Sequence, residues 1–196
     1  MMETVLARKS TFSPLDLQNR SLAWQIGAVT VGALFLALSS HISVPMKPVP
    51  VTMQTFAIAL VGALYGWRLG VITILAWLGQ AALGAPVLAG GAGGAHHFAG
   101  ATAGYLFAFP FAGAQAGWLA ERGWNGNRLV LAFASMMLSN VVCLLLGAAW
   151  LATLIGLEHA FLLGVAPFII GALLKSALGT ATLALLVRGR MRGPQA

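Results

Sequence analysis

Long apolar runs, separated by short polar segments or by segments rich in glycine and proline, divide this chain. Six runs are predicted to be membrane-spanning helices, at residues 22–40, 52–66, 69–83, 98–119, 129–151 and 164–187. A helix needs about 20 apolar residues to cross the hydrocarbon core. The second and third runs have only about 15 each, so they are short spans or a re-entrant hairpin covered by protein. We expect a tight break between them at Trp67-Arg68.

The composition assigns the chain to the membrane class. Of its 196 residues, 59% are hydrophobic and 8% are charged, whereas a soluble domain carries about 25% charged residues. We therefore expect an all-α integral membrane protein, a six-transmembrane-helix bundle with ordered external loops over a ligand pocket. Residues 1–21 are predicted to be a cytoplasmic tail, 22–187 a single membrane domain and 188–196 a basic cytoplasmic tail. The first span lacks the cleavage site of a secretory signal, so we expect it to be retained.

Basic residues gather on one side of the predicted bundle. Lys and Arg precede the first span, follow the last, and occupy the connections at Arg68 and at 122–128, while the opposite side has only Lys47. The positive-inside rule then places both termini in the cytoplasm. The net charge of +7 is thus explained by topology, and no nucleic-acid partner is expected. The proline-rich connector 41–51, the glycine-rich segment 84–97 and a loop at 152–163 are predicted to be external.

Lys175 is the only charged side chain well inside an apolar run. Such a group costs about 2.5–3.5 kcal/mol to insert, and it usually marks a functional site. No carboxylate lies within a run to pair with it. We expect Lys175 to face a polar pocket and to help hold a small, anionic ligand; the alternative is a lysine that snorkels to the membrane interface.

Other polar and small residues allow two interpretations each. The glycine-rich segment lacks the phosphate-binding GxxxxGK[ST] pattern and is expected to be a loop over a cavity. His96 and His97 are weak evidence for metal, because no further ligands accompany them, and we expect no metal. Asn140, near a span centre, more often bonds a neighbouring helix than a ligand. Ala33 and Ala37 form a small-residue stripe suited to close helix packing, most simply within the same bundle.

Four segments together resemble the BioY family, the biotin-binding S components of energy-coupling factor (ECF) transporters. They are VPVTMQ at 49–54, GxPVxxGGxxG at 84–94, GxTxGY at 100–105 and PFxxGxxxK at 167–175. They occur in the family's order and spacing, and the resemblance covers about residues 22–187.

The resemblance implies a six-helix bundle in the bacterial cytoplasmic membrane that binds biotin near its outer face. Loops after the first and third helices would cover the ligand, and helices four to six would contact it. The partners implied are a transmembrane coupling protein and two cytoplasmic ATPases. Ala33 and Ala37 match the stripe by which such subunits dock on the coupling protein.

The chain departs from the family pattern at three places. Ala172 stands where the last helix often has Asp, Ala92 where the glycine-rich loop often has Asn or Ser, and Ala101 where the fourth helix has Pro. Polar contacts to the ligand are therefore expected from other residues. The candidate substitutes are His96, His97, Asn140, Thr102 and Tyr105.

The predicted substrate-binding residues combine the polar candidates with the loop and its neighbours. They are Lys175, Gln54, Tyr105, Asn140, Thr102, Gly91, Ala92, Gly93, Phe98, Ala172 and His96. Phe98, Trp150 and Phe168 are expected to form apolar walls. Lys175 is expected either to donate to the ureido oxygen of biotin or to pair with its carboxylate.

The predicted function is high-affinity biotin binding and uptake as the substrate-specific subunit of an ECF transporter, with no catalysis and no cofactor. One alternative is a stand-alone or ion-coupled vitamin carrier, although no Asp, Glu or His relay occupies the spans. A second is a small multispan membrane enzyme. Such an enzyme would require acidic side chains at its site. All four acidic residues of the chain lie in predicted tails or loops: Glu3, Asp16, Glu121 and Glu158.

Overall fold

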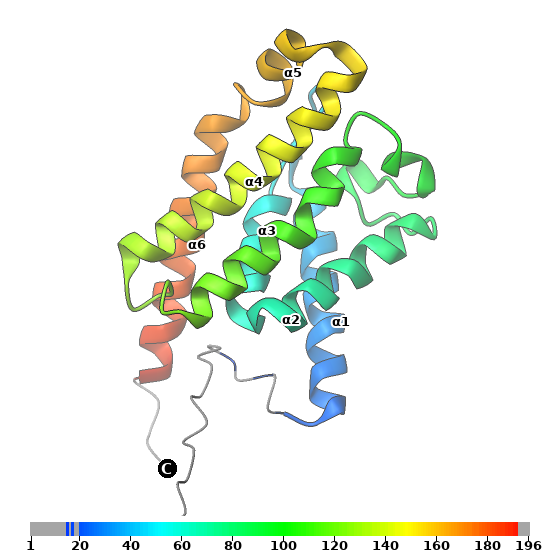
Figure 1. Cartoon of the computed structure of the whole chain (residues 1–196). Coiled ribbons are helices and arrows are strands. Elements are labelled where there is room, and N and C mark those ends of the chain that lie inside the picture. Colours follow the sequence, from blue (N-terminus) through cyan, green and yellow to red (C-terminus); the bar gives the residue numbers. More distant parts are fainter. Residues whose placement is uncertain (1–14, 16, 18–19, 192–196) are drawn as a thin grey trace, which may run out of the picture.

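The computed structural model describes residues 15, 17 and 20–191 (Figure 1). Its helices are α1 (Leu22–His41), α2 (Gln54–Ala82), α3 (Ala103–Glu121), α4 (Leu129–Ile155), α5 (Leu157–Gly164) and α6 (Phe168–Met191). Two-residue strands β1 (Ser43–Val44) and β2 (Val51–Thr52) pair antiparallel, and the glycine-rich loop holds two 3₁₀ turns, η2 (Ala89–Gly91) and η3 (Ala95–Phe98). The predicted all-helical membrane fold is confirmed, and α1, α2, α4 and α6 are each long and apolar enough to span a membrane.

Helix α2 contains both of the short predicted spans, joined by a kink. Gly66 has φ 78° and ψ 167°, which ends the first half of the helix where the run 52–66 was predicted to end. A left-handed φ of this kind suits glycine. The second half begins at Trp67, whose backbone N–H donates to the Glu121 carboxylate of α3 at 3.2 Å. The acid thereby satisfies one of the free N–H groups at this new helix start.

Two predicted element boundaries are wrong. Helix α3 begins at Ala103 and not at Phe98, because the preceding residues form the η3 turn. The segment 152–163 is not a loop: α4 runs to Ile155, and Gly156, with φ 83°, separates it from α5. Residues 188–191, at the start of the predicted basic tail, continue α6. The rest of that predicted tail, and most of the predicted tail at 1–21, fall outside the residues that the structure describes.

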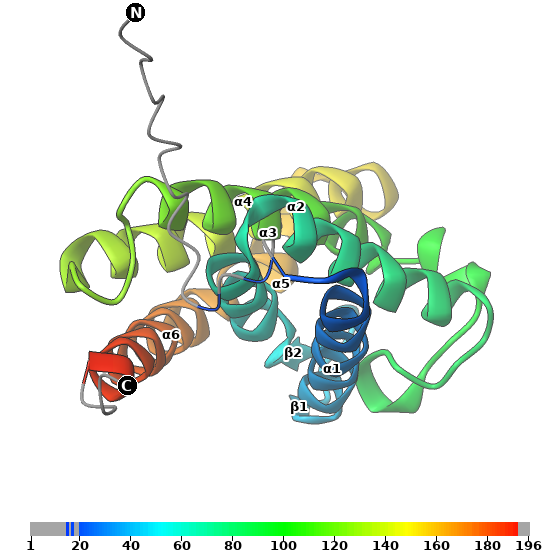
Figure 2. The same cartoon turned by 90° about the horizontal axis from the view of Figure 1, so that it is seen from below.

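The bundle has two distinct ends. In Figure 1 the start of α1, the end of α6 and the turn from α3 to α4 lie at the bottom, while the hairpin, the glycine-rich loop and α5 lie toward the top. Seen along the bundle in Figure 2, α1 and α6 stand apart below the layer that contains α3 and α4. Arg20, Arg122, Arg128 and Arg188 all belong to segments at the bottom end.

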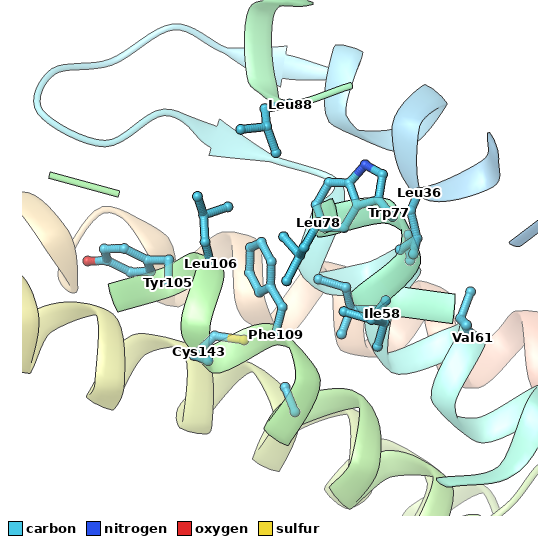
Figure 3. Packing of buried hydrophobic residues seen from close by; sticks show 14 of the residues in the cluster. Leu36, Ile58, Val61, Trp77, Leu78, Leu88, Tyr105, Leu106, Phe109 and Cys143 are labelled. Atoms are coloured by element: carbon cyan, nitrogen blue, oxygen red, sulfur yellow. The ribbon is translucent and has the colours of Figure 1, made fainter. Parts of the chain in front are cut away.

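Helices α2 and α3 pack in backbone contact. A side chain at Gly62 would collide with the Gly113 carbonyl, and one at Gly117 would collide with the backbone of Trp67. Trp77, fully buried, stacks on Phe109 with ring centroids 5.9 Å apart (Figure 3). These contacts bury one face of α3 against α2 and fix the positions of both helices.

The small-residue stripe of α1 faces the bundle. Ala33 is only 2% exposed and belongs to the main core cluster, and Ala37 packs against that cluster. The exposed side of α1 instead carries large apolar residues such as Val31, Leu34 and Leu38. Ala33 and Ala37 therefore pack within the chain, as the simpler interpretation of their spacing expects, and Ala33 presents no free docking surface.

Candidate ligand-binding cavity

A cavity of about 360 Å³ lies where the proline-rich connector and the glycine-rich loop meet the helices. The connector contributes Pro48, Val49 and Pro50, and the loop contributes residues between Leu88 and Thr102. The helical walls are Gln54, Thr55, Tyr105, Leu106, Phe109, Asn140, Cys143, Leu144, Phe168, Ala172 and Lys175. A mainly apolar cavity with a few polar groups is typical of a small-molecule site.

A second hollow, of about 440 Å³, lies beside the start of α1. It is more open, and its lining is apolar except for Tyr65. The Tyr65 hydroxyl donates to the carbonyl of Ala28 within the chain. The cavity under the loops is therefore the better candidate for a ligand with polar groups.

Lys175 is a buried cation in the cavity wall. It is 9% exposed, and its Nζ donates to Thr55 Oγ1 at 3.2 Å. Phe168, Ala172 and Lys175 follow one another at four and three residues, so they lie on one face of α6. No carboxylate is among the described residues that line the cavity. An ammonium carries three N–H donors, and within this site Thr55 is the one side chain to which it donates.

Asn140 brings a buried amide to the same cavity. It is 3% exposed, and its Nδ2 donates to the Met136 carbonyl at 3.1 Å and to Ser176 Oγ of α6 at 3.3 Å. The expected bond to a neighbouring helix is present, and the residue lines the cavity as well. Cys143 and Leu144 follow on the same face of α4.

Gln54 joins the hairpin to α1 at the edge of the cavity. Its Nε2 donates to Ser40 Oγ at 3.0 Å, and its Oε1 accepts from Thr52 Oγ1 at 2.9 Å. Both polar atoms of the amide are thus engaged within the chain. This bonding places the connector over the start of α2, where Thr55 meets Lys175.

Two tryptophans hold the two ends of the glycine-rich loop. Trp77 Nε1 of α2 donates to the Val87 carbonyl at 3.0 Å, and Trp150 Nε1 of α4 donates to the Gly100 carbonyl at 3.0 Å. Between them, the Gly94 N–H donates to the Ala81 carbonyl at 2.7 Å. Trp150 was expected to be a cavity wall, but it lies behind the loop and positions it.

Tyr105 forms part of the apolar wall. Its hydroxyl donates to the Gly164 carbonyl at 2.8 Å, and its ring stacks on Phe168 at 6.3 Å. Gly147 and Gly164 make room for it, because a side chain at either position would collide with the tyrosine. Tyr105 therefore connects α3 to the end of α5 and the start of α6.

His96 and His97 lie on the loop side of the cavity, with ring centroids 4.1 Å apart. Burial, and then the neighbouring His96, lower the pKa of His97 below its ordinary value. No group of three or more His, Cys, Asp or Glu side chains suited to a metal ion occurs among the described residues. The pair supplies hydrogen-bonding groups on the loop side of the cavity.

Eight of the predicted site residues line the cavity: Lys175, Gln54, Tyr105, Asn140, Thr102, Ala92, Ala172 and His96. Gly91, Gly93 and Phe98 do not. Gly93 is closely packed against the Ala85 carbonyl, and Phe98 packs edge-on against Phe107 at 6.0 Å. These three belong to the structure of the loop rather than to the wall of the cavity.

Sequence reasoning missed five lining residues on the helices: Thr55, Leu106, Phe109, Cys143 and Leu144. Helical spacing contained the signal for all of them except Thr55. Cys143 is three residues after Asn140, and Phe109 is four after Tyr105, so each shares a helix face with a predicted site residue. Thr55 is next to Gln54, and only the approach of α6 identifies it.

Comparison with known proteins decides the family. The BioY family model matches residues 9–192. The chain belongs to the BioY family. A probable biotin transporter BioY of Pyrococcus horikoshii is 38% identical over 84% of this chain and 96% of its own length. The biotin transporter BioY of Rhizobium etli is 37% identical over 81% of this chain and 86% of its own length.

A solved structure shares the fold of this BioY family member. It is the S-component for biotin from an ECF-type ABC transporter, with a TM-score of 0.76 and 25% sequence identity. The match covers 89% of this chain and 96% of the solved chain. Together with the apolar helices, it identifies the chain as a multi-pass membrane protein of S-component architecture.

Proposed function

We propose that this chain binds biotin in the cavity under the two loops and is the substrate-binding subunit of an ECF-type transporter. The observation that carries the proposal is the buried pair of polar side chains, Lys175 and Asn140, in an otherwise mainly apolar cavity. Biotin has a polar ureido head on an apolar bicyclic ring, and this lining is complementary to it. Membership of the BioY family supports the same ligand.

Biotin crosses the membrane without chemical change, and partner proteins supply the energy for its transport. A transmembrane coupling protein and two ATPase subunits are the partners proposed, which the likeness to an ECF S-component supports. The loops over the cavity then face outward, and both termini are cytoplasmic. The arginines at the opposite end of the bundle support that orientation.

The test is direct binding by the purified chain in detergent, measured by calorimetry and by the shift of its melting temperature. Ligand at 100 times its Kd stabilises a protein by about 2.7 kcal/mol, so biotin is expected to raise the melting temperature. Lipoate is the matched control ligand, because it has a similar carboxylate tail and no ureido group. An equal response to both ligands, or none to biotin, would contradict the proposal.

A further inference from the structure

We infer that the side-chain carbonyl of Asn140 accepts a hydrogen bond from a ureido N–H of the bound ligand, beside Lys175, which donates to the ureido oxygen. The inference rests on the proposed function and deepens it. It assigns the ligand's orientation: the ureido head lies against α4 and α6, and the carboxylate tail lies on the side lined by His96 and His97.

The orientation of the Asn140 amide is fixed by its neighbours. Both hydrogens of Nδ2 have acceptors, the Met136 carbonyl and Ser176 Oγ. Rotating the amide by half a turn would set Oδ1 against the Met136 carbonyl, two acceptors in opposition. The Asn140 carbonyl oxygen therefore takes part in neither bond, and no described residue donates a hydrogen bond to it.

That oxygen is an unused acceptor in a wall of the cavity. Asn140 is 3% exposed and lines the site. Among the described residues, Ser135 Oγ is the one fully buried side-chain polar atom without a partner, so the unpaired Asn140 oxygen is accessible from the cavity. Gln54, the other amide in the lining, already uses both of its polar atoms. Ala172, which precedes Lys175 on the same face of α6, offers only a methyl group.

The two polar side chains together select a ureido group over a carboxylate. Lys175 provides donors, and Asn140 provides an acceptor. A ureido group matches both, because it has a carbonyl oxygen and two N–H groups. A carboxylate at neutral pH has no hydrogen to donate, so at this position it would leave the Asn140 oxygen unpaired and facing negative charge.

The experiment measures coupling between the residue and the ligand. Affinities for biotin, and for the two isomers of biotin methylated on one ureido nitrogen, are compared in the wild-type chain and in Asn140→Leu. In the wild type, one isomer is expected to bind about 10- to 100-fold more weakly than biotin. In Asn140→Leu, biotin itself weakens, and the ratio between biotin and that isomer approaches one.

Ser139→Ala is the matched control. Ser139 is also buried and polar on α4, but it bonds Gln115 and the Ala112 carbonyl and does not line the cavity. Loss of the Ser139 hydroxyl should change the free energy of unfolding and leave the affinities for biotin and for both methylated isomers unchanged. If Asn140→Leu does not fold, Asn140→Ser, whose short hydroxyl does not reach as far, gives the same ratio test.

The outcomes are separable. A wild-type chain that binds no biotin overturns the proposed function, and this inference with it. A wild-type chain that binds biotin, but shows the same ratio in the Asn140 variant or no loss with either methylated isomer, overturns this inference alone and leaves the proposed function standing.

Discussion

Helices α2 and α3 run side by side through two very different regions. Near the kink, Gly62 meets Gly113 and Gly117 meets Trp67 in direct backbone contact. About one to two turns away, the same helices carry Thr55, Tyr105 and Phe109 around a cavity of about 360 Å³. The difference comes from side-chain size, since glycines let two helices touch. At the other end the helices carry larger side chains, which line the cavity beneath the two loops.

The two regions of α2 and α3 have different roles. The closely packed region has no room for a ligand. It fixes the positions of α2 and α3, and therefore the positions of the side chains that line the cavity on these helices. The cavity region carries the polar side chains, and its roof is tied down by side chains from α2 and α4. Damage to the first region should unfold the protein, and damage to the second should change ligand binding.

The largest effect is expected from Gly62→Val. The new side chain would collide with the Gly113 carbonyl, and overpacking of this kind costs about 1–3 kcal/mol or more. We expect a strong fall in melting temperature and in the yield of monodisperse protein. Gly79→Val, on the exposed side of the same helix with nothing within 4 Å, is the control. Equal behaviour of the two variants would contradict the close α2–α3 contact.

A smaller effect is expected from Trp150→Phe. This change keeps a ring but removes the bond from Trp150 Nε1 to the Gly100 carbonyl, a loss of about 1 kcal/mol. We expect biotin to dissociate about fivefold faster, because one end of the roof is released, while the melting temperature without ligand changes little. Stopped-flow or filter-binding kinetics measure the rate. An unchanged rate would show that this bond does not govern the roof.

The smallest effect concerns pH. His97 has a lowered pKa in the free protein because of burial and His96, so folding favours its neutral form, and this contribution to stability is lost as pH falls below about 6.5. A ligand carboxylate nearby would favour the imidazolium and raise that pKa. Biotin affinity should therefore rise a few-fold from pH 8 to about pH 5.5, the direction opposite to that of stability.

This pH dependence has its own controls. The other titratable side chains lining the cavity, among the residues described, are His96, Tyr105, Cys143 and Lys175. His97→Gln should flatten the profile, whereas His159→Gln on α5, which does not line the cavity, should leave it unchanged. If the biotin affinity of the wild-type chain did not change with pH, the carboxylate of biotin would not lie near His97.

Much of this architecture could be predicted from sequence. Apolar length and charge placement indicate the spans, and a lone lysine in an apolar run indicates the site, because both follow from the cost of polar groups in lipid. Two short runs were expected between residues 52 and 83, and α2 has two halves that separate at Gly66. The second half begins at Trp67, two residues earlier than the predicted Leu69.

The sequence-based predictions that were wrong concern positions that depend on tertiary contacts. Trp150 was predicted to be a wall, but its indole points to a loop carbonyl fifty residues away in sequence. Phe98 was assigned to a span and to the site, yet the 3₁₀ turn directs it toward Phe107. Thr55 was not foreseen, because only the packing of α6 brings Lys175 to it. Pattern locates elements and their faces, whereas such pairings arise only once the helices are assembled.

The central claim is that Lys175, a buried cation under the two loops, holds the ligand, and equilibrium binding of biotin to Lys175→Met tests it most directly. Lys47→Met, in the connector and not in the cavity lining, is the matched control. Loss of a buried charged hydrogen-bond partner costs about 2–5 kcal/mol, so we predict at least a 30-fold weaker affinity, by about 1.4 kcal/mol per tenfold, for Lys175→Met and no change for Lys47→Met. Unaltered affinity in a folded Lys175→Met would contradict the account.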